Sequence, residues 1–157
     1  LLKSYKNFSN KNEKLNFNLI IIGEDEENIY SKYIKNHPYF HSIKYIKFSN
    51  EINKFLCASD IFCLPSYREG FGNAVLEASS TSLPVIATSI YGLEDVLIDN
   101  FSGIKIVPGD INNLTDKMQL LYDDDSLRKK LGHNGRKHAT HLFSNKDVIE
   151  FFLKFFL

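Results

Sequence analysis

Short apolar runs recur along the chain between longer amphipathic segments. Each run is apolar on both faces of an extended segment and is rich in Ile, Val, Leu or Phe, which is typical of buried strands. The predicted strands lie at residues 17–23, 43–48, 60–65, 84–88 and 103–108. Since helical segments separate them, they predict an α/β fold with a doubly wound, Rossmann-like parallel sheet.

Apolar residues at helical spacing fill the intervals between these strands. Predicted helices lie at residues 29–35, 51–58, 72–82, 111–122, 126–141 and 146–157, with a turn and short helix at 92–98. Asn50 is the expected N-cap of helix 51–58. Leu1, Leu2, Tyr5 and Phe8 also have helical spacing, so we expect the chain to begin within a helix.

Ligands of a doubly wound sheet bind beyond the carboxyl ends of its strands. The loops that follow Ile22, Phe48, Leu64, Thr88 and Val107 are therefore expected to share one edge of the sheet.

Composition narrows the function classes. The 157 residues fit a single domain, and 43% apolar with 24% charged residues exclude a disordered chain. Nineteen basic residues balance nineteen acidic ones, which disfavours a nucleic-acid partner. No apolar run is long enough to span a membrane. Cys57 and Cys63 lie in apolar stretches, so we expect two buried thiols and no disulfide.

The loop after Leu64 carries the most informative chemistry. Gly70 and Gly72 flank Phe71 where a strand passes into a helix, and glycines allow close approach of the backbone to a ligand. The first turn of the following helix has free amides and the positive end of the helix dipole. This loop is therefore a candidate site for an anion such as a diphosphate.

Two carboxylates accompany this loop, Glu69 before the helix and Glu77 within it. Carboxylates repel phosphate but accept hydrogen bonds from sugar hydroxyls. An anion site between them suits a nucleotide diphosphate sugar. The alternative is that both are ordinary charges near a helix N-terminus, where the dipole favours them.

Four segments then resemble a known family. Residues 58–66 read Ala-Ser-Asp-Ile-Phe-Cys-Leu-Pro-Ser, and 68–78 read Arg-Glu-Gly-Phe-Gly-Asn-Ala-Val-Leu-Glu-Ala. Leu-Pro-Val-Ile-Ala-Thr at 83–88 and Gly-Ile-Lys-Ile-Val-Pro-Gly-Asp at 103–110 follow in the same order. Together they resemble the C-terminal, donor-binding domain of retaining glycosyltransferases of the GT-B fold, GT4 type, over residues 15 to 150.

The resemblance implies a role for each matching residue. Glu69 corresponds to the catalytic glutamate that contacts the transferred sugar, and Glu77 to the one that binds the donor ribose. The turn that faces sugar and diphosphate corresponds to Gly70, Phe71, Gly72 and Asn73. Glu94 and Asp95 are expected near the donor, although charges at a helix start explain them equally well.

The resemblance also implies the reaction and the partners. The family transfers a sugar from a nucleotide diphosphate donor to an acceptor hydroxyl with retention, and requires no metal or other cofactor. The expected acceptor is a glycan or lipid-linked sugar, in surface polysaccharide or glycolipid synthesis. The expected location is the cytoplasm, with a second interpretation of peripheral contact at the inner membrane face.

Residues 1–157 are expected to form a single nucleotide-sugar-binding domain that is a fragment. Its N-terminal acceptor domain and first strand are expected to be absent, together with the basic residues that grip the diphosphate. The fragment alone is expected to be inactive, and the full-length protein to be a transferase.

Two other functions remain open, a non-catalytic nucleotide-sugar-binding module and a sugar-nucleotide epimerase. A dinucleotide-dependent dehydrogenase is disfavoured, because acidic residues rather than Gly-x-Gly-x-x-Gly follow Gly23.

Two clusters outside this loop have simpler interpretations. Asp123, Asp124 and Asp125 predict a helix cap rather than a metal site. Helix 126–141 is basic, which predicts a solvated face or, as a second interpretation, contact with anionic lipid. Its histidines, His133, His138 and His141, are expected on the surface.

Overall fold

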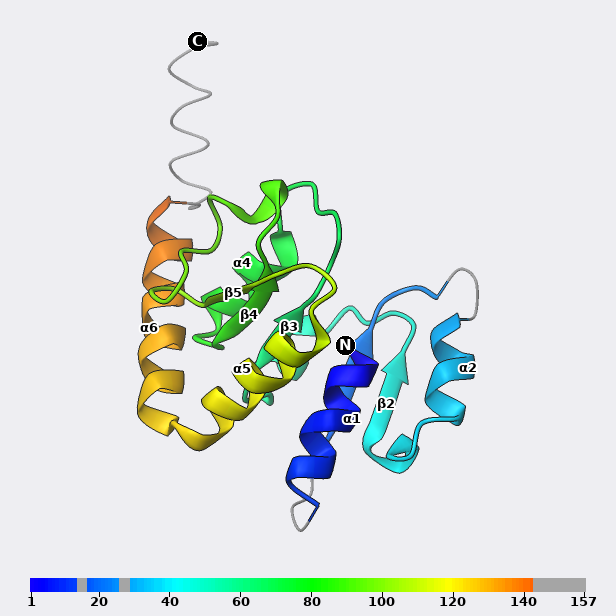
Figure 1. The fold of residues 1–157 in the computed structure, drawn as a ribbon. Coiled ribbons are helices and arrows are strands. Elements are labelled where there is room, and N and C mark those ends of the chain that lie inside the picture. The colour runs from blue at the N-terminus through cyan, green and yellow to red at the C-terminus, as the bar shows by residue number, and fades with distance from the viewer. Residues whose placement is uncertain (14–16, 26–28, 143–157) are drawn as a thin grey trace.

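The computed structural model describes residues 1–13, 17–25 and 29–142 (Figure 1). The helix expected at 146–157 lies outside the described residues. Helices alternate with strands as the sequence predicts. The helices are α1 (Leu2–Lys11), α2 (Ile29–Lys35), α3 (Ile52–Cys57), α4 (Asn73–Ser80), α5 (Ile111–Asp123) and α6 (Asp125–Leu142), with short 3-10 helices η1 (Phe40–Ser42) and η2 (Tyr91–Leu93). The strands are β1 (Leu19–Ile22), β2 (Ile43–Ile46), β3 (Phe62–Leu64), β4 (Val85–Thr88) and β5 (Ile104–Ile106).

Every strand pairing in the described chain is parallel. β1 pairs with β2, and β4 lies between β3 and β5. The α/β class and the parallel pairing are thus confirmed. The hydrogen-bonded ladders run in two groups, since β1 and β3 each have a ladder partner on one side only within the described residues.

The three-stranded sheet separates two apolar cores, because successive side chains along a strand point to opposite faces. Ile86 of β4 packs into a core built with α1, α5 and α6. Val85 and Ala87 pack into a second core with α3, α4 and the segment after β4. Helices therefore cover both faces of this sheet, as expected for a doubly wound arrangement.

Helix α1 connects the first half of the chain to the second through contacts with α5. Figure 1 shows α1 beside α5, and Ser4 Oγ donates to the Ile111 carbonyl at 3.1 Å. Lys11 Nζ also lies 2.9 Å from Asp116 Oδ1. Tyr5 and Phe8 of α1 are buried, which confirms the helical spacing of the opening residues.

Two local expectations were wrong. Helix α3 begins one residue later than predicted, with Glu51 rather than Asn50 as the N-cap and no side-chain cap hydrogen bond. Cys57 is exposed, because it lies at the end of this short helix. Both cysteines are free thiols, as predicted.

Candidate functional site

Three loops meet at the carboxyl edge of the three-stranded sheet. The buried Thr88 hydroxyl, at the end of β4, donates to the Ser66 carbonyl at 2.6 Å. Gly92 packs against the carbonyl group of Glu69, and the Tyr67 ring lies against Gly109. The predicted meeting of the loops after Leu64, Thr88 and Val107 is therefore confirmed.

The loops after β1 and β2 also lie together. The Gly23 amide donates to the Ile46 carbonyl at 3.1 Å, and the Tyr45 hydroxyl donates to the Gly23 carbonyl at 2.8 Å. Within the first sheet, these two loops share an edge, and a single edge for all five loops stays a prediction.

The N-cap residue of α4 is a glycine, which has no side chain to accept a hydrogen bond from the first turn. Gly72 is the N-cap in the left-handed conformation, with φ of 71°, and its carbonyl accepts from the amides of Val75 and Leu76. An N-cap side chain normally accepts a hydrogen bond from the first-turn amides, and glycine has none. The amides of Asn73 and Ala74 donate to no other described residue. The N-terminus of α4 is therefore open to an anion.

The segment after β4 determines the shape of this bend. A Cβ on Gly72 would overlap Leu93 Cδ2 and lie 2.9 Å from Val96 Cγ2, and both neighbours are buried. Positive φ and this close packing together require glycine at the bend. Gly70 faces open space instead, since no atom lies within 4 Å of a Cβ placed there.

The two predicted carboxylates lie on either side of the bend. Glu69 is half-buried in the turn, whereas Glu77 is exposed on α4, roughly 6 Å along the helix axis from Asn73. Within the part of the chain that the structure describes, neither carboxylate has a hydrogen bond or ion pair. Both are thus free to accept hydrogen bonds from hydroxyl groups. Their roles, and those of Gly70, Phe71, Gly72 and Asn73, stay predictions.

Sequence reasoning missed two supports of this site. Thr88 shows no sequence signal beyond a polar residue at the end of a buried strand. His138 was expected simply on the surface, but its Nε2 donates to the Asp95 carbonyl at 2.7 Å. This hydrogen bond links α6 to the segment after β4. Glu94 and Asp95 themselves are exposed.

The aspartate cluster caps a helix, as predicted. Asp124 Oδ1 accepts from the Leu127 amide at 2.8 Å, and Asp125 pairs with Arg128 at 2.7 Å and Lys129 at 2.6 Å. The hydrogen bond from Lys129 is the main cause that lowers the pKa of Asp125. Among the described residues, no group of three or more His, Cys, Asp or Glu side chains could hold a metal ion.

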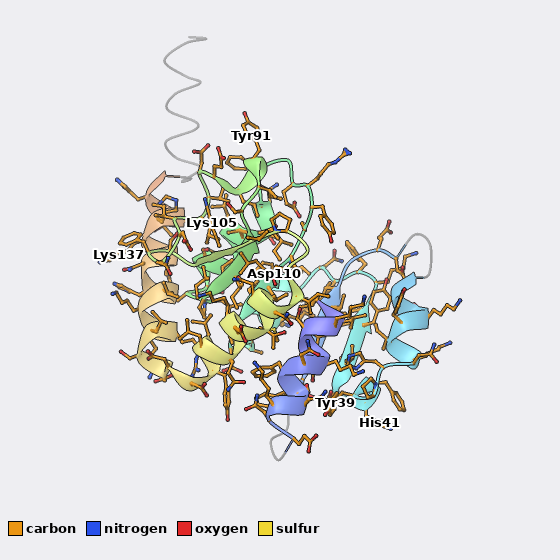
Figure 2. The ribbon with its side chains drawn as sticks, viewed as in Figure 1. Tyr39, His41, Tyr91, Lys105, Asp110 and Lys137 are labelled. Carbon is orange, nitrogen blue, oxygen red and sulfur yellow. The ribbon has the colours of Figure 1, made fainter. Side chains whose placement is uncertain are left out.

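Large apolar side chains are exposed in the loops of the carboxyl edge. They are Tyr67 and Phe71 after β3, Tyr91 after β4 and Val107 after β5, while Phe48 is exposed in the loop after β2 of the other sheet. Figure 2 shows Tyr91 pointing away from the strands, at the outer end of its segment. Exposed apolar side chains gathered at one edge are typical of a ligand or protein contact surface.

Comparisons with known proteins identify the family of the chain. Residues 1–138 match the family described as Glycosyl transferases group 1. The chain belongs to this family.

Individual relatives and solved structures match this chain over part of their own length. It is 33% identical to the capsular polysaccharide biosynthesis glycosyltransferase CapM of Staphylococcus aureus, over 96% of this chain and 40% of CapM. The solved C-terminal domain of a group 1 glycosyl transferase (LpcC) from Francisella tularensis is 27% identical, with a TM-score of 0.77. That match covers 88% of this chain and 75% of the other. The Anabaena protein HepE, solved with UDP-glucose, shares the fold at 21% identity and a TM-score of 0.78, over 87% and 41% of the two chains.

The chain thus spans about 40% of the length of CapM. No helix in the described ranges is both long and apolar enough to cross a membrane.

Proposed function

We propose that this chain is the donor-binding part of a retaining glycosyltransferase that uses a nucleotide diphosphate sugar. The observation that carries the proposal is the uncapped N-terminus of α4. It opens at the edge where three loops meet, with two unpaired carboxylates beside it. Family membership supports a transferase over an epimerase.

The open amides of Asn73 and Ala74 hold the diphosphate in this proposal. Sugar transfer leaves negative charge on the departing diphosphate, and fixed amide dipoles stabilise such charge without reorganising. The exposed bend at Gly70 and Phe71 lets the donor approach the backbone closely.

The carboxylates orient the two ends of the donor. Glu69, in the turn, accepts hydrogen bonds from hydroxyls of the transferred sugar and so holds the reacting carbon in place. Glu77, on the exposed face of α4, accepts from the ribose hydroxyls. In this arrangement each carboxylate binds neutral hydroxyl groups next to the diphosphate, and it thereby orients the donor.

Two similar proteins support the class of substrate in this proposal. CapM is a capsular polysaccharide biosynthesis glycosyltransferase, and HepE was solved with UDP-glucose. We accordingly propose a nucleotide sugar donor and a glycan or lipid-linked acceptor in surface polysaccharide synthesis.

A further parallel strand between β1 and β3 completes the proposed protein. The order β2–β1 and β3–β4–β5 corresponds to the doubly wound order 3-2-1-4-5-6 without its central strand. β1 consists of Leu and three Ile, yet it is only partly buried. Amide hydrogen exchange tests this: in the longer protein the amides of β1 and β3 should exchange more slowly than in this chain.

An acceptor domain covers the apolar edge in the same proposal, and this chain alone has no transferase activity. A non-catalytic binding module is the second candidate, supported by the uncapped N-terminus of α4 and the two unpaired carboxylates within the described residues. Turnover separates the two, because only the enzyme transfers or hydrolyses a nucleotide sugar when the longer protein is assayed.

We propose that this turnover persists in EDTA, since the α4 amides supply the positive field.

Calorimetric titration of this chain with UDP, GDP and ADP tests donor binding directly. We expect one of them to bind, and Glu77→Ala to weaken that binding about tenfold through loss of the ribose hydrogen bonds. In the longer protein, Glu69→Ala should lower transfer about 100-fold or more while changing nucleotide affinity less.

Asp123→Ala is the control, since this exposed carboxylate lies at the far end of α5. Equal, negligible binding of all three nucleotides would overturn the proposal. If Glu77→Ala and Asp123→Ala bind the nucleotide with equal affinity, Glu77 does not contribute to the donor site.

A further inference from the structure

Gly92 lies where the segment after β4 touches the turn that carries Glu69. A Cβ on Gly92 would overlap the Glu69 carbonyl oxygen, lie 2.7 Å from its carbonyl carbon and 3.1 Å from the Gly70 carbonyl oxygen. Real Cβ atoms do not approach backbone so closely, so any side chain at Gly92 must displace one of the two segments.

The segment that contains Gly92 is fixed from behind. Leu93 is fully buried, Val96 is nearly so, and both pack against Gly72. His138 Nε2 holds the Asp95 carbonyl at 2.7 Å. Displacing this segment would therefore open the second core and break a hydrogen bond to α6.

The turn, in contrast, has room to move. Gly70 is exposed and has open space where its side chain would be. Glu69 makes no hydrogen bond to other described residues through its carboxylate. A side chain at Gly92 is thus accommodated by moving Glu69 and Gly70 outward, into the space that the proposed function gives to the sugar of the donor.

We propose that Gly92 is a positioning residue for the transfer reaction, because its missing side chain sets the depth of the Glu69 turn. This inference rests on the proposed function of the site. In this inference Gly92 affects how the sugar of the donor is bound, whereas binding of the nucleotide depends on Glu77.

Gly132 offers a matched control. A Cβ there would overlap the Ser82 carbonyl oxygen and lie 2.9 Å from the Ser82 carbonyl carbon, which is nearly the geometry of Gly92. The contact joins α6 to the loop that precedes β4, away from the carboxyl edge. Gly132→Ala therefore reproduces the strain without touching the site.

The test compares the affinities of this chain for UDP and UDP-glucose. For Gly92→Ala we expect the preference for UDP-glucose over UDP to fall at least about tenfold, with UDP affinity itself changed less. Gly132→Ala should keep that preference within twofold while it lowers the unfolding temperature to a similar extent. An unchanged preference in Gly92→Ala would overturn the inference.

Two further measurements test the role of Gly92. In amide NMR spectra without ligand, Gly92→Ala should shift Glu69 and Gly70 more than Leu93 and Val96; the reverse pattern would overturn it. If Gly92→Ala does not fold, His138→Ala should loosen the same segment and reduce the preference, and His138→Gln, whose amide can donate to Asp95, should restore it. If the wild-type chain binds neither UDP nor UDP-glucose, a uridine nucleotide sugar is excluded as its donor. The NMR comparison, which needs no ligand, then decides whether Gly92 sets the position of the Glu69 turn.

Discussion

Strands β4 and β1 are both four residues long and mainly apolar, but their surroundings differ. Val85–Thr88 is completely buried, with a paired strand on each side and helices over both faces. Leu19–Ile22 is more apolar, yet it pairs on one side only, and Ile20 is 38% exposed. The apolar composition of a strand therefore predicts that it is buried, whereas the number of strands paired with it determines how much of it is buried.

The loops at the carboxyl ends of the two groups of strands also differ in the contacts that hold them. After β3, β4 and β5 the loops support one another through Thr88, Gly92 and Tyr67. After β1 and β2 the loops are joined by hydrogen bonds around Gly23. The well-packed half of the molecule is thus the half that holds the candidate donor site.

The largest expected effect comes from matched isoleucine truncations in these two strands. Ile86→Ala should lower the free energy of unfolding by roughly 3–5 kcal/mol, because a fully buried side chain leaves a cavity. Ile20→Ala should cost about 1 kcal/mol or less, since its side chain is partly in solvent. Urea unfolding measures both, and equal losses would show that β1 is as well packed as β4.

Cysteine alkylation compares the exposed end of α3 with the edge strand β3. Burial raises the pKa of the Cys63 thiol to about 12, so at pH 8 its reactive thiolate fraction is about 10⁻⁴. Cys57 is exposed. Iodoacetamide followed by mass spectrometry should modify Cys57 at least about 100-fold faster than Cys63. Comparable rates would mean that the free edge of β3 opens readily.

Threonine-to-valine substitutions compare a hydrogen bond in the site with one on the surface. Thr88→Val should lower the free energy of unfolding by about 1–2 kcal/mol, because the Ser66 carbonyl loses its buried donor. Thr140→Val removes a similar bond to the Arg136 carbonyl on exposed α6 and should cost about 0.5 kcal/mol or less. Calorimetric unfolding distinguishes them, and equal costs would remove Thr88 as a support of the loop.

The smallest expected effect concerns pH and the exposed start of α6. The pKa of Asp125 is lowered chiefly by its hydrogen bond from Lys129, so its folded value lies below the usual 3.8. The resulting stabilisation is present above pH 3.8 and is lost as the pH falls through the folded-state pKa. Unfolding temperatures of wild type and Asp125→Asn should differ slightly at pH 6 and converge in acid. A difference that grows in acid would contradict this.

Much of the fold could be predicted because local patterns and tertiary packing agree. The run Val85–Thr88 is apolar on both faces and becomes the central buried strand. The Gly72 bend was predictable as well, since a glycine between a strand and a helix marks a special backbone conformation. The N-cap of α3 was not, because Asn50 has the stronger N-cap propensity, yet the helix begins after Glu51, whose side chain makes no cap hydrogen bond.

The supports of the site were harder to predict, because they depend on contacts between distant residues. Nothing local marks His138 as the donor to Asp95, 43 residues away. The close approach of Gly92 to Glu69 likewise exists only when two loops meet. Sequence patterns predict which loops share an edge, while the depth and orientation of each loop require the assembled fold.

The central claim is that the first amides of α4 bind the diphosphate of a nucleotide sugar. Titration of the ¹⁵N-labelled chain with UDP-glucose, followed by amide NMR, tests this most directly. We expect saturable shifts centred on Gly72, Asn73 and Ala74, with smaller ones at Glu69 and Glu77. Saturable shifts centred elsewhere, for example on α1 beside Asp110, with the α4 amides unmoved, would contradict it.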